Sequence, residues 1–237
     1  MSAFAEVSGS FLREQIRAPL NLVLLVFIPL FFVLIFAEVL GEFAAALGGD
    51  LAERAATSIS AGWAAAFLCG TLAFFQLSSS READRRLAGA GLGAWRVAGG
   101  RIVAALALGV IVSAVAYLTL WVRTGIEHPP HAALAIFGFA AIYIGIGALI
   151  GALVRDQLAG SLLIVLVFSL DVFTGPSMTS NTTFATTPTR DAGDLLIAAG
   201  LGQGSPASEW IGSGVFAISA LAVALCAFWL SARTRSS

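Results

Sequence analysis

The chain has 237 residues, of which 58 % are hydrophobic and only 11 % are charged, and its formal net charge is −1. A soluble globular domain carries about 25 % charged residues, so a water-soluble fold is excluded and no nucleic-acid partner is expected. The apolar residues fall into blocks of about 20, the length that a helix needs to cross roughly 30 Å of hydrocarbon. The composition therefore predicts an all-helical integral membrane protein, with a single transmembrane domain over residues 1–237.

The stretch before the first apolar block, residues 1–18, predicts an amphipathic helix that lies in the inner membrane interface. Phe4 and Phe11 fall on one side of a helical wheel, whereas Glu6 and Arg13 fall on the other. A frayed polar terminus is the alternative interpretation. The first apolar block is too long for the core of a signal peptide, so we expect no cleaved leader.

Six apolar blocks predict six transmembrane helices, at about residues 20–40, 58–78, 100–122, 132–154, 158–173 and 209–230. Pro29 interrupts the first block, and we expect a kink there because a proline frees a backbone carbonyl of the preceding turn. Gly147 and Gly151 in the fourth block have the spacing that lets two helices approach closely. We interpret this spacing as packing inside the bundle, with a dimer contact as the alternative.

The distribution of arginine predicts the orientation, because short cytoplasmic loops are enriched in basic residues. With the N-terminus inside, ten arginines lie in inner segments, and the outer segments hold three, namely Arg54, Arg123 and Arg190. An even number of spans then places both termini in the cytoplasm. We expect a multi-pass protein of the plasma membrane, in contact with membrane lipid.

The inner segment between the second and third predicted spans favours a short amphipathic helix, followed by a glycine-rich link and an interfacial tryptophan, Trp95. Small and apolar residues occupy one face, at Ala83, Leu87 and Ala90. Charged residues occupy the opposite face, at Arg81, Glu82, Arg85 and Arg86. Glu82 and Arg86 are four residues apart, and such a pair stabilises a helix by roughly 0.2–0.5 kcal/mol. An ordinary basic loop that anchors the topology is the alternative.

The outer segment between the fifth and sixth predicted spans, residues 174–208, predicts a loop and then a re-entrant segment. Residues 177–189 are rich in Ser and Thr. The apolar run Leu195–Leu201 is too short to cross a bilayer. We therefore expect it to dip in from outside or to lie on the surface.

Residues that carry enzymatic chemistry are sparse, and we predict no catalytic, cofactor-binding or metal site. His128 and His131 lie in a short outer loop and are interpreted as solvated, and no predicted span contains a histidine. Cys69 and Cys226 lie inside apolar blocks and are expected to pack there. A P-loop needs a lysine against the phosphates, and the sequence contains no lysine. If ATP drives this protein, ATP and Mg²⁺ bind to a separate ATPase subunit.

Ion coupling is the alternative to an ATP-driven mechanism, because it needs an ionisable group at membrane depth. The acids nearest to the span cores are Glu38 and Asp171. We expect both toward outer ends of spans, within reach of water, with Asp171 as a candidate vestibule residue. A six-span secondary transporter or channel is therefore the second hypothesis, and a structural membrane scaffold is the third.

Three features along the chain carry a family resemblance. The inner loop begins Arg81-Glu82-Ala-Asp84, after two spans and before four more. The turn Gly151-Ala-Leu-Val-Arg-Asp-Gln and the run Thr174-Gly-Pro-Ser-Met follow the fourth and fifth spans. In this order of parts the sequence resembles the ABC-2 type permeases, the membrane subunits of ABC exporters. It departs from them in lacking an Asn-Pro before the last span, where Thr187-Pro-Thr-Arg is the nearest match.

The resemblance implies a half-transporter that pairs with a second copy or a paralogue and with two copies of an ABC ATPase, and that exports a lipid-like or amphipathic substrate. In such exporters the loop between spans two and three contains the helix that couples to the ATPase. The resemblance therefore implies that the residues that couple this chain to the ATPase are Arg81, Glu82, Asp84, Arg85 and Arg86. Spans one, two and five usually line the path at the dimer seam. The candidates for the lining are Phe67, Phe74, Phe75, Phe168, Asp171 and Phe173, with core packing or lipid contact as the alternative for the phenylalanines.

Cysteine labelling tests the orientation, in a background from which Cys69 and Cys226 have been removed. Single cysteines at outer positions are expected to react with an impermeant thiol reagent added outside, because of the ten-to-three arginine asymmetry. These positions are Asp50, Glu127 and Asn181. Cysteines at inner positions are expected not to react in intact cells. These positions are Ala83, Asp156 and Ser236. The reverse pattern would contradict the orientation.

Overall fold

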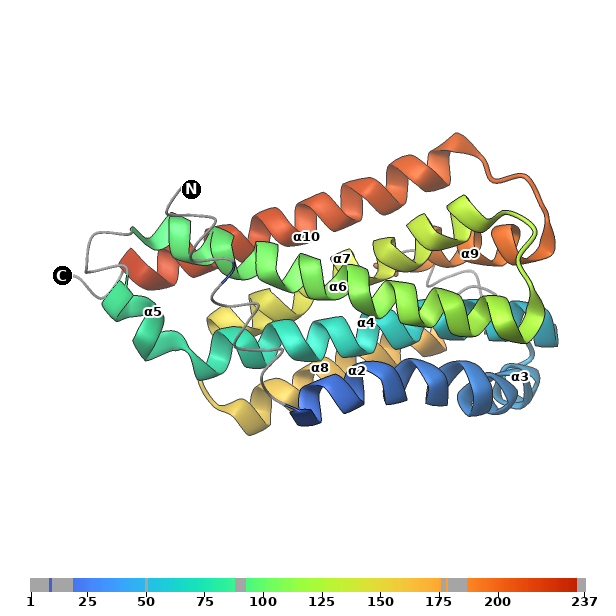
Figure 1. Ribbon diagram of the computed structural model, residues 1–237, viewed down its shortest axis with the longest axis horizontal. Helices are drawn as coiled ribbons and strands as arrows, with labels where there is room; N and C mark the ends of the chain where they lie inside the picture. The colour runs from blue at the N-terminus through green and yellow to red at the C-terminus, as the bar shows by residue number, and fades with distance from the viewer. Residues whose placement is uncertain are drawn as a thin grey trace.

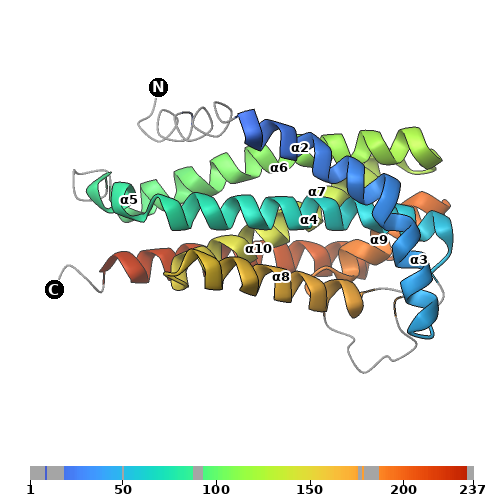
Figure 2. The same ribbon diagram turned by 90° about the horizontal axis from the view of Figure 1, so that it is seen from below.

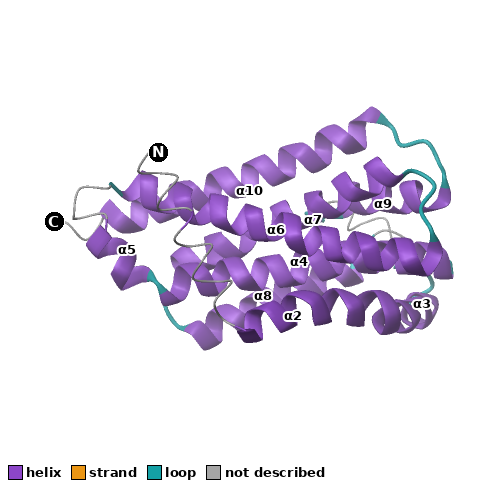
Figure 3. Ribbon diagram, viewed as in Figure 1, coloured by secondary structure: helices purple, strands orange, loops and turns teal. Residues whose placement is uncertain are grey.

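Every regular element in the part of the chain that the structure describes is a helix (Figure 3). In this computed structural model, that part comprises residue 9 and residues 19–49, 51–87, 93–175, 178 and 187–233. The helices are α2 (Pro19–Phe31), the π-helical turn η1 (Phe32–Phe36), α3 (Ala37–Ala46), α4 (Glu53–Ser79), α5 (Arg81–Leu87), α6 (Ala94–Thr124), α7 (Pro129–Leu153), α8 (Gln157–Phe173), α9 (Arg190–Leu201) and α10 (Ala207–Arg233). Apart from residue 9, the interfacial helix predicted for residues 1–18 lies outside the described residues.

Five described segments are long and apolar enough to cross a membrane, namely Leu25–Ala46, Glu53–Ser79, Trp95–Thr124, Pro129–Leu153 and Ala207–Leu230. Helix α8 is apolar but has only 17 residues. The prediction of an all-helical, membrane-embedded chain is confirmed, and each of the six predicted blocks coincides with a helix. The count of six crossings stays a prediction.

Helices α4 and α7 form the centre of the bundle, and most of the other helices pack around this pair (Figure 1). The apolar parts of α4 and α7 are 78 % and 67 % buried, against 28 % for the first span and 17 % for α10. The composition of α4 explains its central position, because its many Ala, Ser and Gly residues let neighbouring backbones approach. α6, α8 and α9 each lie against both central helices, and α10 lies against α7.

Glycines set the distance between α4 and α7. A side-chain carbon at Gly147 would overlap the backbone of Gly70, and one at Gly151 would lie 3.1 Å from the carbonyl oxygen of Phe74. Gly147 and Gly151 therefore face α4 across the centre of the bundle. The interpretation of their spacing as close packing within the chain is confirmed.

The first span changes helix type where the sequence predicts a kink. Pro29 lies inside α2, and the π-helical turn η1 follows directly. A π-turn disturbs the regular pairing of backbone carbonyls, and Arg123 at the end of α6 supplies donors to two of them. Its Nη1 donates to the carbonyl oxygens of Val33 and Leu34, both at 2.5 Å. Its Nη2 donates to Glu38 at 3.1 Å, so a single arginine stabilises the irregular turn.

The apolar run in the outer segment forms the second half of α9, which is buried in the bundle. Leu195 is almost fully covered, and a side-chain carbon at Gly200 would meet the hydroxyl group of Ser58 in α4. The backbone N–H of His128, just before α7, donates to the carbonyl oxygen of Ala199 at 3.2 Å. This run therefore does not lie on the surface of the bundle, because α9 packs among α4, α7 and α10. Its position relative to the membrane stays a prediction.

Replacing Gly147 with Ala is expected to destabilise the bundle, because the added methyl group forces α4 and α7 apart. The expected loss is about 1–3 kcal/mol, as for other overpacked cores, even though alanine favours a helix. Thermal denaturation of the purified chain measures the loss. Gly214→Ala is the matched control, since nothing lies within 4 Å of its added carbon. Equal stability of the two variants would contradict the close approach.

Candidate functional site

Helix α5 forms where the sequence predicts it, at the end of the bundle where α4 ends and α6 begins (Figure 1). Glu82 and Arg86 form the predicted ion pair, with Arg86 Nη2 at 2.5 Å from Glu82 Oε1. Both side chains are exposed. Asp84 and Arg85 belong to the same helix, but their side chains lie outside the described part of the chain. The exposed pair gives α5 a charged surface.

Arg81 does not belong to the outward charged face, so the direction predicted for it is wrong. Its Nη2 donates to the carbonyl oxygens of Gly151 and Val154, at the end of α7. An α-helix leaves its last carbonyl groups without partners, and a cation is favoured at this negative end of the helix dipole. Arg81 therefore joins the start of α5 to the end of a central helix.

The other end of α5 is held by an apolar contact and followed by a glycine. Leu87 packs against Val97 and Ala104 of α6, which confirms its predicted place on the apolar face. Gly93, at the start of α6, has a φ of 76°, in the left-handed region that favours glycine. The link after α5 thus contains a position that requires this residue.

Two of the predicted lining residues belong to a row of aromatic rings inside the bundle. The ring centroids of Phe67 in α4 and Phe168 in α8 lie 5.0 Å apart. Phe32 of η1 lies 6.1 Å from each of them, and Tyr143 of α7 lies 6.0 Å from Phe168. The row therefore connects the first span with the centre of the bundle.

The other three phenylalanines lie elsewhere. Phe74 is fully buried against Ile150 and Ile164, so core packing is the interpretation that holds for this residue. Phe75 and Phe173 are exposed on the outside of the bundle. The aromatic candidates thus do not form one continuous surface.

Asp171 is buried, and the prediction that water reaches it is wrong. It lies near the end of α8 with 3 % of its surface exposed. Its Oδ2 accepts two hydrogen bonds of 2.8 Å, from the hydroxyl of Tyr143 in α7 and from the hydroxyl of Thr189 directly before α9. No basic side chain among the described residues forms an ion pair with it. Glu38, in contrast, is exposed and pairs with Arg123.

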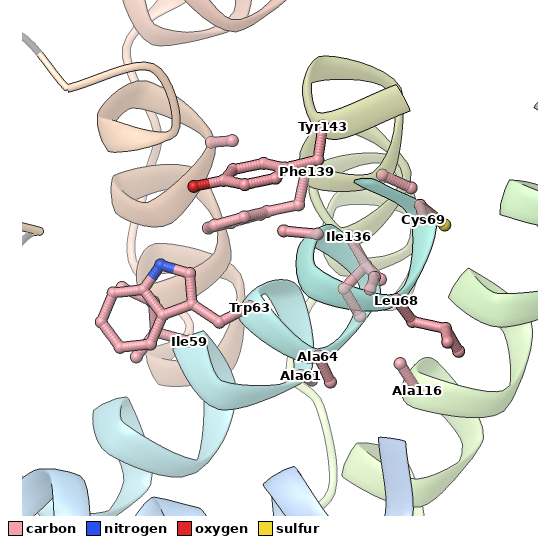
Figure 4. Close-up of a cluster of buried hydrophobic side chains, with 14 of the residues drawn as sticks. Ile59, Ala61, Trp63, Ala64, Leu68, Cys69, Ala116, Ile136, Phe139 and Tyr143 are labelled. Atoms are coloured by element: carbon pink, nitrogen blue, oxygen red, sulfur yellow. The ribbon is translucent and has the colours of Figure 1, made fainter. Parts of the chain in front are cut away.

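Trp63 Nε1 is a buried polar atom in this region that has no hydrogen-bond partner among the described residues. The hydroxyl of Thr187 and the backbone N–H of Thr189 are further hydrogen-bond donors to the carboxyl group of Asp171. The Trp63 ring packs against Gly175, two residues beyond α8. Figure 4 shows the indole nitrogen of Trp63 and the hydroxyl of Tyr143 on the same side of the buried cluster. The break between α8 and α9 is therefore a polar region within an apolar bundle.

Tyr143, Thr189 and Trp63 were not predicted from the sequence as residues of this region. Within its own segment each of them is an ordinary core or loop residue, and Tyr143 is 28 positions from Asp171. Residue chemistry could have suggested this contact. Tyr143 and Asp171 both lie in apolar blocks, and a buried tyrosine or acid needs hydrogen-bond partners.

The described part of the chain contains no group of three or more His, Cys, Asp or Glu that could hold a metal ion. His128 and His131 are exposed, and the ring of His131 lies 5.3 Å from that of Trp210. No protein-family model, curated protein or solved structure matches this chain. Functional conclusions therefore depend on the geometry of α5 and of the Asp171 region.

Replacing Tyr143 with Phe is expected to lower the free energy of unfolding by about 1–3 kcal/mol, because Asp171 loses a donor and cannot recruit water. Thermal denaturation of the purified chain measures the change. Thr119→Val is the matched control, since the Thr119 hydroxyl donates to Val115 of its own helix and leaves no buried acid unpaired. A shift no larger than that of the control would contradict the role of Tyr143.

Proposed function

We propose that this chain is the permease subunit of an ABC exporter, with ATP and Mg²⁺ bound on a separate ATPase and no catalytic residue of its own. The observation that carries the proposal is the junction between α5 and α7. α5 is a short, charged helix between two long apolar helices, and Arg81 joins it to the last carbonyl groups of α7. Movement of α5 by a docked ATPase would thus reach the central helix pair directly.

The positions of the helix ends support six crossings with a cytoplasmic α5. α2 begins and α10 ends toward the same end of the bundle as α5 (Figure 2). In the proposed topology α8 is the short fifth crossing, and α9 is the re-entrant segment between the fifth and sixth. The arginine distribution assigns the α5 end to the cytoplasmic side of the plasma membrane.

The exposed face of α8 supports pairing with a second copy or a paralogue. Large apolar side chains recur at every fourth position along this helix, at Leu158, Leu162, Leu166 and Leu170. Such a stripe suits a helix partner or lipid. In the proposed dimer α8 and the first span face the partner, and the translocation path between them carries a lipid-like or amphipathic substrate.

An ion-coupled six-span transporter or channel is the second candidate, because Asp171 is an acid inside an apolar bundle. The energy source separates the two candidates. Transport by the reconstituted permease and its ATPase should require ATP hydrolysis and should persist without an ion gradient. Transport driven by a gradient alone would favour the second candidate.

Reversing the charge of α5 with Glu82→Arg or Arg86→Glu is expected to abolish most substrate efflux while the bundle stays folded. Both side chains are exposed, so stability should change by no more than about 0.5 kcal/mol. A docked ATPase, however, would meet an inverted charge pattern, and like charges across an interface oppose association. Chain abundance in the membrane, co-purifying ATPase and efflux are measured for each variant.

The double variant Glu82→Arg with Arg86→Glu is the matched control for helix stability, because it restores an ion pair four residues apart. It is expected to keep α5 folded and still to lose efflux. Normal efflux with an intact complex in all three variants would contradict a coupling role for α5. The helix would then serve only to fix the orientation of the chain in the membrane.

A further inference from the structure

The first span bends between α2 and α3 (Figure 2), and its buried face shifts by one residue at the π-helical turn η1. Before the turn, the buried Leu25 and Phe32 lie about two helical turns apart on one face. An unbroken α-helix would bury the positions about one turn and about three turns beyond Phe32. The buried residues lie one position further along instead, at Ala37 and Ala44. The span therefore contains one residue more than a continuous α-helix with this buried face would need.

The backbone hydrogen bonds show how η1 accommodates the extra residue. The N–H of Ala37 donates to the carbonyl oxygen of Phe32, whereas in an α-helix it would donate to that of Val33. Nη1 of Arg123 donates to the Val33 carbonyl oxygen and also to that of Leu34. Arg123 therefore stabilises the carbonyl group whose α-helical partner the π-turn has taken.

The helix type of η1 determines which side of α3 faces the bundle. If the turn became a regular α-helix, α3 would rotate by about 100°, the angle that one residue spans. Phe36 and Phe43 would then take the places of Ala37 and Ala44. Two phenylalanine rings do not fit into a close-packed space that two alanines fill, so α3 would have to move away from α4.

The rotated arrangement would not bury a charge. The outward side of α3 contains exposed apolar side chains, at Val39 and Phe43. Glu38 and Glu42 would move into these two exposed positions, so neither carboxylate would enter the core. Because either side of α3 can pack without burying a carboxylate, the two helix types correspond to two discrete arrangements of the same segment.

We propose that η1 is a register switch in the first span and that Arg123 holds it in the π-helical state. With Arg123 bound to the turn, α3 packs on α4 through Ala37 and Ala44. Without Arg123 the Val33 carbonyl loses a donor, which favours its α-helical pairing with Ala37. The second half of the span then rotates and moves away from α4. The switch belongs to the isolated chain and does not depend on the proposed function.

Distances between two spin labels test the rotation in the purified chain, in a background without Cys69 and Cys226. The labels replace Glu42 of α3 and Ile211 of α10, which are both exposed. The chain with Arg123 is expected to give a single distance. Arg123→Met keeps an apolar side chain but removes the donors, and is expected to add a second distance. The shift is up to about 8 Å, for a rotation of about 100° at a side-chain radius of roughly 5 Å.

Arg54→Met is the matched control for the loss of an arginine. Arg54 donates to the carbonyl oxygen of Thr124 and lies 3.7 Å from Glu127, away from η1. Its replacement is expected to leave the single distance between the labels unchanged.

Deletion of one residue tests the extra residue directly. Removing Leu34 from the turn should give a continuous α-helix that still buries Ala37 and Ala44. The midpoint of thermal unfolding is expected to change little, and Arg123→Met should then no longer add a second distance. Deletion of Val110, also exposed, is the control, because α6 has no π-turn to absorb the change. It is expected to lower the midpoint by several degrees or to prevent folding.

Three outcomes would overturn the proposal. A single, unchanged distance in Arg123→Met would show that Arg123 does not hold the turn. A second distance that persists after deletion of Leu34 would show that α3 detaches without a change of register. If deletion of Leu34 is as damaging as deletion of Val110, the extra residue is required by the fold. If Arg123→Met does not fold, the comparison of the two deletions still decides.

Discussion

The close approach of α4 and α7 is the constraint on which the other features of the bundle depend. Gly147 lies so near the Gly70 backbone that no side chain fits between the two helices at this point. Because this pair occupies the centre, the first span, α6, α8 and α10 are left on the outside, where many of their large apolar side chains are exposed. The space beside the pair also admits α9, whose Gly200 is close to Ser58.

Helix α7 connects the two candidate sites. At one end, its last carbonyl groups accept hydrogen bonds from Arg81 of α5. Farther along, Tyr143 donates to Asp171 at the break between α8 and α9. A shift of α5 would therefore act on α7, and α7 on the break, through hydrogen bonds and a tightly packed helix. Under the proposed function, α7 would carry the movement of α5 to Asp171 and the start of α9.

The sequence predicted what depends on local composition and missed what depends on contacts between distant residues. Long apolar blocks determined the positions of the membrane helices, and the spacing of Glu82 and Arg86 determined their ion pair. The direction of Arg81 is set by carbonyl groups 70 and 73 positions away. The burial of Asp171 is set by α7 and α9, which no periodicity in α8 reveals. The π-helical turn likewise depends on Arg123, 90 positions from Val33.

Purification of the chain from its native membrane in a mild detergent, with the mass of the intact complex as readout, tests the central claim most directly. An ABC exporter predicts a complex with two ATPase subunits and two permease subunits, and ATP hydrolysis that requires the ATPase subunits. A chain that purifies without any ATPase, from a membrane in which it is fully active in transport, would contradict the assignment.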